Sequence, residues 1–134
     1  SRDAGRPGMS SGLEAVQEAV TADGGLLAAA LVEGSGEPVT TGADLRARVI
    51  ELVREGYLLH HGDARVVSQT DPDLALLAGD RLYALGLQQL AGVGDLQAIS
   101  VLAELIAAGA RAHAAGEPEV AEELWNSAIG ELEG

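Results

Sequence analysis

Apolar residues recur every three or four positions along most of this chain, which is the spacing of amphipathic helices. The pattern predicts five helical segments, separated by runs rich in glycine, proline and polar residues. They cover residues 11–33, 43–61, 71–91, 96–115 and 119–132. Gly24 and Gly25 interrupt the first segment, so we expect a kink or a break there.

The third segment begins with a clear helix start. Asp71 can accept hydrogen bonds from the first free backbone N–H groups, and Pro72 suits the first helical position. We expect this helix to be the most buried, because few polar residues interrupt it. They are Asp73, Asp80, Arg81, Gln88 and Gln89.

Two other segments divide into an apolar and a polar face. In the second segment the residues expected to face solvent are Arg46, Arg48, Glu51, Arg54 and Glu55. In the fourth segment the expected apolar face consists of Ile99, Leu102, Ala103, Ile106, Gly109, Ala110 and His113.

Composition supports a helical fold. Hydrophobic residues make up 47% of the 134 residues but aromatic residues only 2%, so the apolar mass is mainly alanine, leucine and valine. Alanine and leucine favour helices, and residues that favour strands are scarce. We therefore expect an all-α, single-domain bundle of about five helices, mostly antiparallel because the last three connections are short. It would span residues 9–134, with residues 1–8 an appended remnant or a disordered extension.

Charge and cysteine content exclude several classes of function. The net charge is −13, from 21 acidic residues against eight arginines and no lysine. Nucleic acids and anionic membranes attract clustered basic residues, so we expect neither as a partner. Without cysteine there is no disulfide, thiolate nucleophile or Cys-ligated metal. We see no membrane span and no signal peptide, and expect a cytoplasmic protein.

One cluster offers possible metal ligands. His60, His61 and Asp63 lie close together at the end of the second segment, and His113 is the only other histidine. A site formed by His60, Asp63 and His113 is conceivable. The alternative is structural: His60 would be a hydrogen-bonded helix residue, with His61 and Asp63 capping the helix C-terminus. We favour the structural alternative and expect no metal and no cofactor.

Two segments carry a resemblance to a known family. Residues 57–65 read Tyr-Leu-Leu-His-His-Gly-Asp-Ala-Arg, and residues 76–84 read Leu-Leu-Ala-Gly-Asp-Arg-Leu-Tyr-Ala. Together they resemble the N-terminal half of the all-α trans-isoprenyl (polyprenyl) diphosphate synthases, over roughly residues 43–115. In that family a helix ends in a histidine and the aspartate-rich DDxxD motif. The next long helix then begins with Ala-Gly-Asp.

The chain departs from the family at the aspartate-rich motif. His61, Gly62 and Arg65 occupy the positions of the three motif aspartates. The resemblance implies that those aspartates hold the Mg²⁺ ions that bind the substrate diphosphate, which histidine, glycine and arginine cannot replace. Arg65 could contact a diphosphate directly. The chain also ends before the family's second aspartate-rich motif. The residues of the degenerate motif are His60, His61, Asp63, Arg65 and Asp80.

The resemblance implies a non-catalytic protein that acts as an accessory subunit or a homo-oligomer. An isoprenoid diphosphate is a less favoured ligand. The expected protein contact is the apolar side of the third and fourth helices, namely Leu77, Leu82, Leu85, Ile99, Leu102 and Ile106. An unrelated helical scaffold or adaptor, and a metal-dependent enzyme, stay open as alternatives. His61 and Asp80 facing a shared cavity would favour the first hypothesis, and exposure of both would favour a scaffold.

Overall fold

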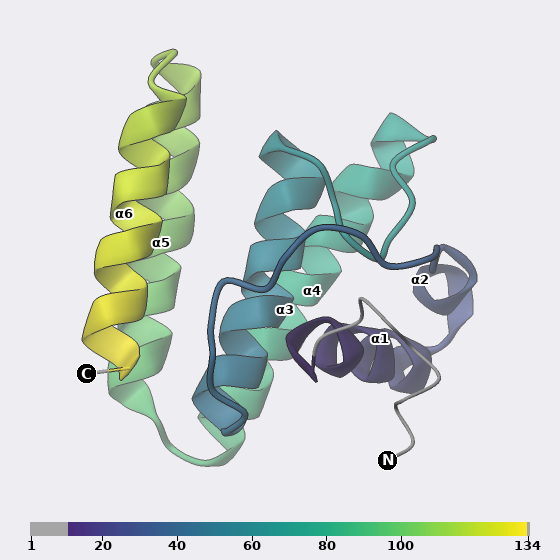
Figure 1. The fold of residues 1–134 in the computed structure, drawn as a ribbon, viewed down its shortest axis with the longest axis horizontal. Coiled ribbons are helices and arrows are strands. Elements are labelled where there is room, and N and C mark those ends of the chain that lie inside the picture. The colour runs from purple at the N-terminus through teal and green to yellow at the C-terminus, as the bar shows by residue number, and fades with distance from the viewer. Residues whose placement is uncertain (1–10, 134) are drawn as a thin grey trace.

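The computed structural model describes residues 11–133, which form six α-helices (Figure 1). The helices are α1 (Ser11–Asp23), α2 (Gly25–Ala29), α3 (Leu45–His61), α4 (Pro72–Gly92), α5 (Leu96–Ala114) and α6 (Pro118–Glu133). Within this range there is no β-strand, only an isolated β-bridge between Leu31 and Val67. The all-α prediction is confirmed. The predicted domain boundary at residue 9 lies outside the described residues.

The extra helix arises from the expected break in the first segment. Gly24 and Gly25 have positive φ angles of 74° and 61°, a conformation that glycine adopts without steric cost. Helix α2 ends at Ala29, so the prediction of a helix up to Glu33 is wrong. The chain becomes extended there, and the Val32 N–H donates to the carbonyl of Val66.

Aspartates begin the three long helices α3, α4 and α5. Asp44 accepts from the Ala47 N–H, and Asp95 accepts from the Ala98 N–H. Asp71 accepts from two N–H groups, with Pro72 in the first turn as predicted. These caps satisfy backbone donors that would otherwise lack a partner, and so fix where each helix starts.

The helices form two antiparallel pairs, α3 with α4 and α5 with α6, and α1 crosses α3 (Figure 1). One hydrophobic core lies between α3 and the α5–α6 hairpin, around Val53, Leu102 and Trp125. A second core lies among α1, α3 and α4, around Val16 and Leu82. Helix α3 contributes to both cores and therefore holds the two halves of the molecule together.

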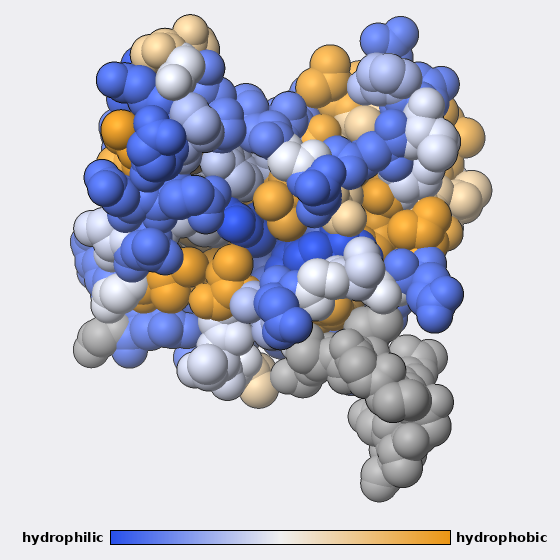
Figure 2. All heavy atoms as spheres, turned by 45° about the horizontal axis from the view of Figure 1, so that its top comes forward, coloured by the Kyte–Doolittle hydropathy of each residue, from blue (hydrophilic) through white to orange (hydrophobic). Residues whose placement is uncertain are grey.

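The most buried helix is α3 and not α4, so that prediction is wrong. Ten of the 17 residues of α3 are buried, against five of the 21 residues of α4. Leu74, Leu76 and Leu77 of α4 are exposed. Figure 2 shows hydrophobic surface on the side of the molecule that carries α2 and the start of α4 (right). An apolar pattern identifies residues that can be buried, but burial also requires a neighbouring element.

The buried face of α5 also differs from the prediction. Ala103 and Ala110 are exposed, whereas Ile99 and Ile106 pack at the edge of the core. The buried residues are Ala98, Leu102, Leu105, Gly109 and Ala112. Alanine and glycine occur on every side of α5, so the apolar pattern of the sequence did not show clearly which face of the helix is buried.

Two glycines let α3 and α4 approach closely. A Cβ atom built on Gly79 would lie 2.5 Å from the His60 ring and 2.9 Å from the Gly56 carbonyl oxygen. One built on Gly56 would lie 2.8 Å from the Gly79 carbonyl oxygen. Gly79 belongs to the Ala-Gly-Asp segment, so that segment has a packing role here: it lets the end of α3 lie against α4.

Candidate functional site

The residues in register with the aspartate-rich motif take three different positions after the end of α3. His61 is half-buried, Asp63 is exposed, and Arg65 is buried with 3% of its surface accessible. Their side chains therefore do not converge on one cavity. The expectation that Arg65 could contact a diphosphate is not met, because a buried guanidinium has no access to a ligand in solvent.

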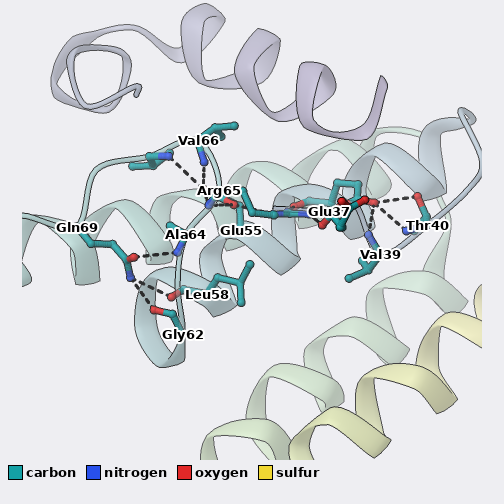
Figure 3. Close-up of polar contacts among 12 residues, drawn as sticks. Glu37, Val39, Thr40, Glu55, Leu58, Gly62, Ala64, Arg65, Val66 and Gln69 are labelled. Carbon is teal, nitrogen blue, oxygen red and sulfur yellow. Dashed lines mark hydrogen bonds and ion pairs between the residues drawn. The ribbon is translucent and has the colours of Figure 1, made fainter. Parts of the chain in front are cut away.

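Arg65 is held by two buried glutamates of α3. Its guanidinium donates from Nη1 to Glu51 Oε1 at 2.7 Å and from Nε to Glu55 Oε1 at 2.9 Å. It also donates to the backbone carbonyls of Glu37 and Glu51, at 3.1 and 3.0 Å (Figure 3). A buried charge is stable only when it is paired and hydrogen-bonded, and this arrangement meets both conditions.

The two glutamates also bind the backbone of two loops. Glu51 Oε2 accepts from the N–H groups of Val39 and Thr40, both at 2.8 Å. Glu55 accepts from the N–H group of Arg65 and from those of Val66 and Val67, at 2.8 and 3.1 Å. We define Glu51, Glu55 and Arg65 as the buried ion-pair cluster. It fastens the 36–40 and 65–67 loops to α3.

The prediction that Glu51 and Glu55 face solvent is wrong. Both are fully buried, with 0% exposure. Helical periodicity placed them opposite the main apolar face of α3, and the prediction assumed that water covers that side. Two loops cover it instead. The four-residue spacing of Glu51 and Glu55 places both glutamates on one face of α3, but glutamates with this spacing are also common on solvent-exposed helices.

The side chain of Gln69, further along the loop, hydrogen-bonds the backbone at the C-terminal end of α3. The Gln69 amide donates to the carbonyls of Leu58 and Gly62, at 3.1 and 2.9 Å, and accepts from the Ala64 N–H (Figure 3). Helix α3 ends at His61, and Gly62 is its C-cap residue. The prediction that His61 and Asp63 cap the helix is therefore wrong, since Gln69 supplies the capping contacts from the loop.

His60 and His61 point to different neighbours. The Nε2–H group of His60 donates to the Leu76 carbonyl at 2.9 Å and lies 3.4 Å from Asp80 Oδ1. The Asp80 side chain is 68% exposed. His61 stacks on His113 of α5, with ring centroids 4.3 Å apart. Asp80 is therefore next to His60, and it does not share a cavity with His61.

Tyr57 is the centre of a polar cluster between α3, α5 and α6. Its hydroxyl lies 2.6 Å from His113 Nε2 and donates to Glu122 Oε2 at 3.3 Å. Arg54 pairs with Glu122 at 3.2 Å and lies over the rings of Tyr57 and Trp125. Burial, reinforced by the Glu122 carboxylate, raises the pKa of Tyr57 to about 12. The Tyr57 hydroxyl is therefore protonated and serves as a structural hydrogen-bond donor at neutral pH.

The histidines do not assemble a metal site in the part of the chain that the structure describes. No three His, Asp or Glu side chains there are grouped so that they could hold an ion. His60 and His113 each have other partners, Leu76 and Tyr57. The alternative of a metal-dependent enzyme using His60, Asp63 and His113 is therefore not supported by the geometry.

An open apolar hollow lies between α2 and the first turns of α4. It has a volume of about 390 Å³. Its apolar lining consists of Leu26, Leu27, Ala30, Leu74, Leu77 and Ala78. Asp23, Ser68 and Arg81 lie at its polar edge. We call this surface the leucine hollow.

Only one of the six residues predicted to bind a partner lies in this hollow. Leu77 lines it and is 65% exposed. Leu82 and Leu102 are buried in two different cores, so they are unavailable to a partner in this fold. Leu85, Ile99 and Ile106 are half-buried against the cores. The predicted contact therefore does not form one continuous surface.

These features define the class of protein: an all-α protein in which Arg65 is bound within the fold and exposed leucines of α2 and α4 line one hollow. None of its helices, within residues 11–133, combines the length and apolar character needed to cross a membrane. No family model matches the chain, and no curated protein or solved structure shows significant similarity to it. The resemblance to isoprenyl diphosphate synthases remains a prediction based on residues 57–65 and 76–84.

Proposed function

We propose that this chain is a non-catalytic, all-α interaction subunit that resembles an isoprenyl diphosphate synthase. One observation carries the proposal: Arg65, at a motif position, is engaged in a buried double ion pair with Glu51 and Glu55. A side chain with these partners cannot also bind a substrate diphosphate without leaving two buried carboxylates unpaired. Residues 61–65 correspond to the motif that binds metal in the family, and here Arg65 of this segment holds the loop against α3.

The leucine hollow supports an interaction role. Leu26 and Leu77 are 77% and 65% exposed, and they lie in one depression of the surface. Single exposed leucines are ordinary, but a concave cluster of them is typical of a surface that binds a partner. The partner could be a catalytic relative, as the resemblance implies, or another component of an assembly.

An unrelated scaffold or adaptor is the second candidate. Asp80 is exposed and pairs with His60, so it does not face a shared cavity with His61. A relative of the synthases was expected to have His61 and Asp80 facing a shared cavity, and the structure does not have this arrangement. The structure does not match the scaffold hypothesis either, because His61 is half-buried against α5. Both candidates share the interaction role and differ only in ancestry.

A substrate-binding experiment tests the proposal. The purified protein is titrated by calorimetry with Mg²⁺ and an allylic isoprenoid diphosphate, and prenyl transfer is measured in parallel with an active synthase as the positive control. We expect neither Mg²⁺-dependent binding of the diphosphate nor turnover. Turnover above background, or saturable Mg²⁺-dependent binding, would overturn the non-catalytic assignment.

A further inference from the structure

The leucine hollow is an exposed apolar depression on the described part of the chain. Leu74 and Leu77 come from α4, one helical turn apart, and Leu26 of α2 lines the same hollow. Burying a leucine side chain that is now in water is favourable. A partner that covers these three leucines together gains the most from apolar contact.

Two aspartates of α4 lie close to the leucines of the hollow along the helix, although neither is part of its lining. Asp73 and Asp80 are exposed on α4, and each lies one helical turn from Leu77. Arg81 at the edge of the hollow pairs with Asp23 at 2.5 Å, and this contact lowers the pKa of Asp23. Arg81 is therefore already neutralised. Asp80 lies 3.4 Å from His60 Nε2, but its side chain is 68% exposed, so the carboxyl groups of both Asp73 and Asp80 are open to a partner beside the leucines.

The other arginines of residues 11–133 are also paired. Every arginine in residues 11–133 has a carboxylate partner within 4 Å, and these residues contain no lysine. The six arginines are Arg46, Arg48, Arg54, Arg65, Arg81 and Arg111. The described surface therefore offers acidic groups and apolar patches to a partner, but no unpaired cation.

We propose that the leucine hollow binds an amphipathic helix of a different protein, with leucine-like side chains on one face and Lys or Arg residues at both ends. The apolar face would enter the hollow, and the basic ends would lie beside Asp73 and Asp80. This inference rests on the proposed interaction role and adds the chemistry of the partner. A second copy of this chain is disfavoured, because it would bring the same acidic edge against Asp73 and Asp80.

Synthetic helices of about four turns test the proposal by fluorescence anisotropy. One peptide carries leucines on one face with lysines at both ends. A second has glutamates in place of the lysines, and a third keeps the lysines but has glutamines in place of the leucines. We expect only the first peptide to bind, with an affinity that falls as salt is added.

Substitutions in the protein locate the binding. The double variant Leu74→Gln, Leu77→Gln should weaken binding of the first peptide by about tenfold or more. The matched control is Val93→Gln, Leu96→Gln, which alters two similarly exposed residues (64% and 74%) outside the hollow and should leave the affinity unchanged. Asp73→Asn with Asp80→Asn should weaken binding at low salt and have less effect at high salt.

Several results would overturn the proposal. Equal binding of the glutamine peptide would mean that charge alone drives association, and absence of binding by the first peptide would remove the hollow as a helix site. If the mass by light scattering is that of a dimer and Leu74→Gln, Leu77→Gln restores the monomer, the occupant is a second copy. None of these results depends on diphosphate binding, so failure here is distinct from failure of the non-catalytic assignment.

Discussion

The imidazole rings of His61 and His113 stack with their centroids 4.3 Å apart and their planes 7° from parallel. The stack joins the end of α3 to the end of α5. Burial, and then the charges that His113 and His60 carry when protonated, lower the pKa of His61. The contact therefore favours the neutral form of His61, and protonation opposes it.

Lowering the pH from 7.5 to 5 should reduce the melting temperature. Because the pKa of His61 is below its usual 6.5 in the folded protein, the unfolded chain takes up more protons over this range. The stabilising contribution is complete above pH 6.5 and is lost as the pH falls below it. Asp23 and Asp95 have pKa values below their usual 3.8, lowered mainly by hydrogen bonds from arginines, so they stay ionised in this window.

The variant His61→Phe isolates this effect. Phenylalanine keeps an aromatic ring against His113 but cannot be protonated, so the variant should lose less stability between pH 7.5 and 5 than the natural sequence. Trp125, the only tryptophan, is 5.2 Å from the Tyr57 ring and reports locally by fluorescence. Identical pH dependence in both proteins would show that other groups are responsible.

Arg65→Met should lower the free energy of unfolding by about 3–5 kcal/mol, because it leaves Glu51 and Glu55 buried without their cation. Urea unfolding followed by circular dichroism measures the change. The double variant Arg65→Met, Glu55→Gln should be less destabilised than the sum of the single changes, since neutral glutamine has no charge to leave unpaired. Simple additivity would argue against an ion-pair contribution.

Gly79→Ala should lower the free energy of unfolding by about 1–3 kcal/mol, because the added methyl group collides with the His60 ring and the Gly56 carbonyl. The matched control is Gly130→Ala in α6, where a Cβ meets no atom within 4 Å. That substitution should stabilise the protein by about 0.5–1 kcal/mol, since alanine favours a helix more than glycine does. Similar effects at both positions would contradict the close approach of α3 and α4.

Tyr57→Phe should lower the free energy of unfolding by about 1 kcal/mol. It removes the hydroxyl that contacts His113 and Glu122 but keeps the ring that packs on Trp125. Thermal unfolding at pH 7.5 measures the change. An unchanged free energy of unfolding would mean that water replaces the hydroxyl contacts at no cost, and that ring packing alone holds the cluster.

The helices of this protein could be predicted from local sequence. Asp44, Asp71 and Asp95 cap helices through contacts with residues two or three positions away, and Gly24 breaks a helix through its own φ angle. Such interactions depend only on neighbours in the chain. For that reason the helix boundaries after residue 43 agree with the prediction within about two residues.

The environment of each helix face could not be predicted in the same way. Glu51 and Glu55 have the same spacing as a solvent-exposed pair, and only the loops at 36–40 and 65–67 make them buried. In the sequence, Arg65 likewise looks like a residue that could contact a diphosphate. Its role became clear only when its partners, 10 and 14 residues away, were known.

The sequence by itself determined that this chain is helical, acidic, and without the aspartates of the motif it resembles. Those properties follow from composition and from interactions within a few residues. Only the tertiary structure decided that α3 is central, that Arg65 is buried and that the leucines at α2 and α4 are left uncovered. Burial is a property of the element lying opposite a side chain, and elements distant in the sequence meet only when the chain has folded.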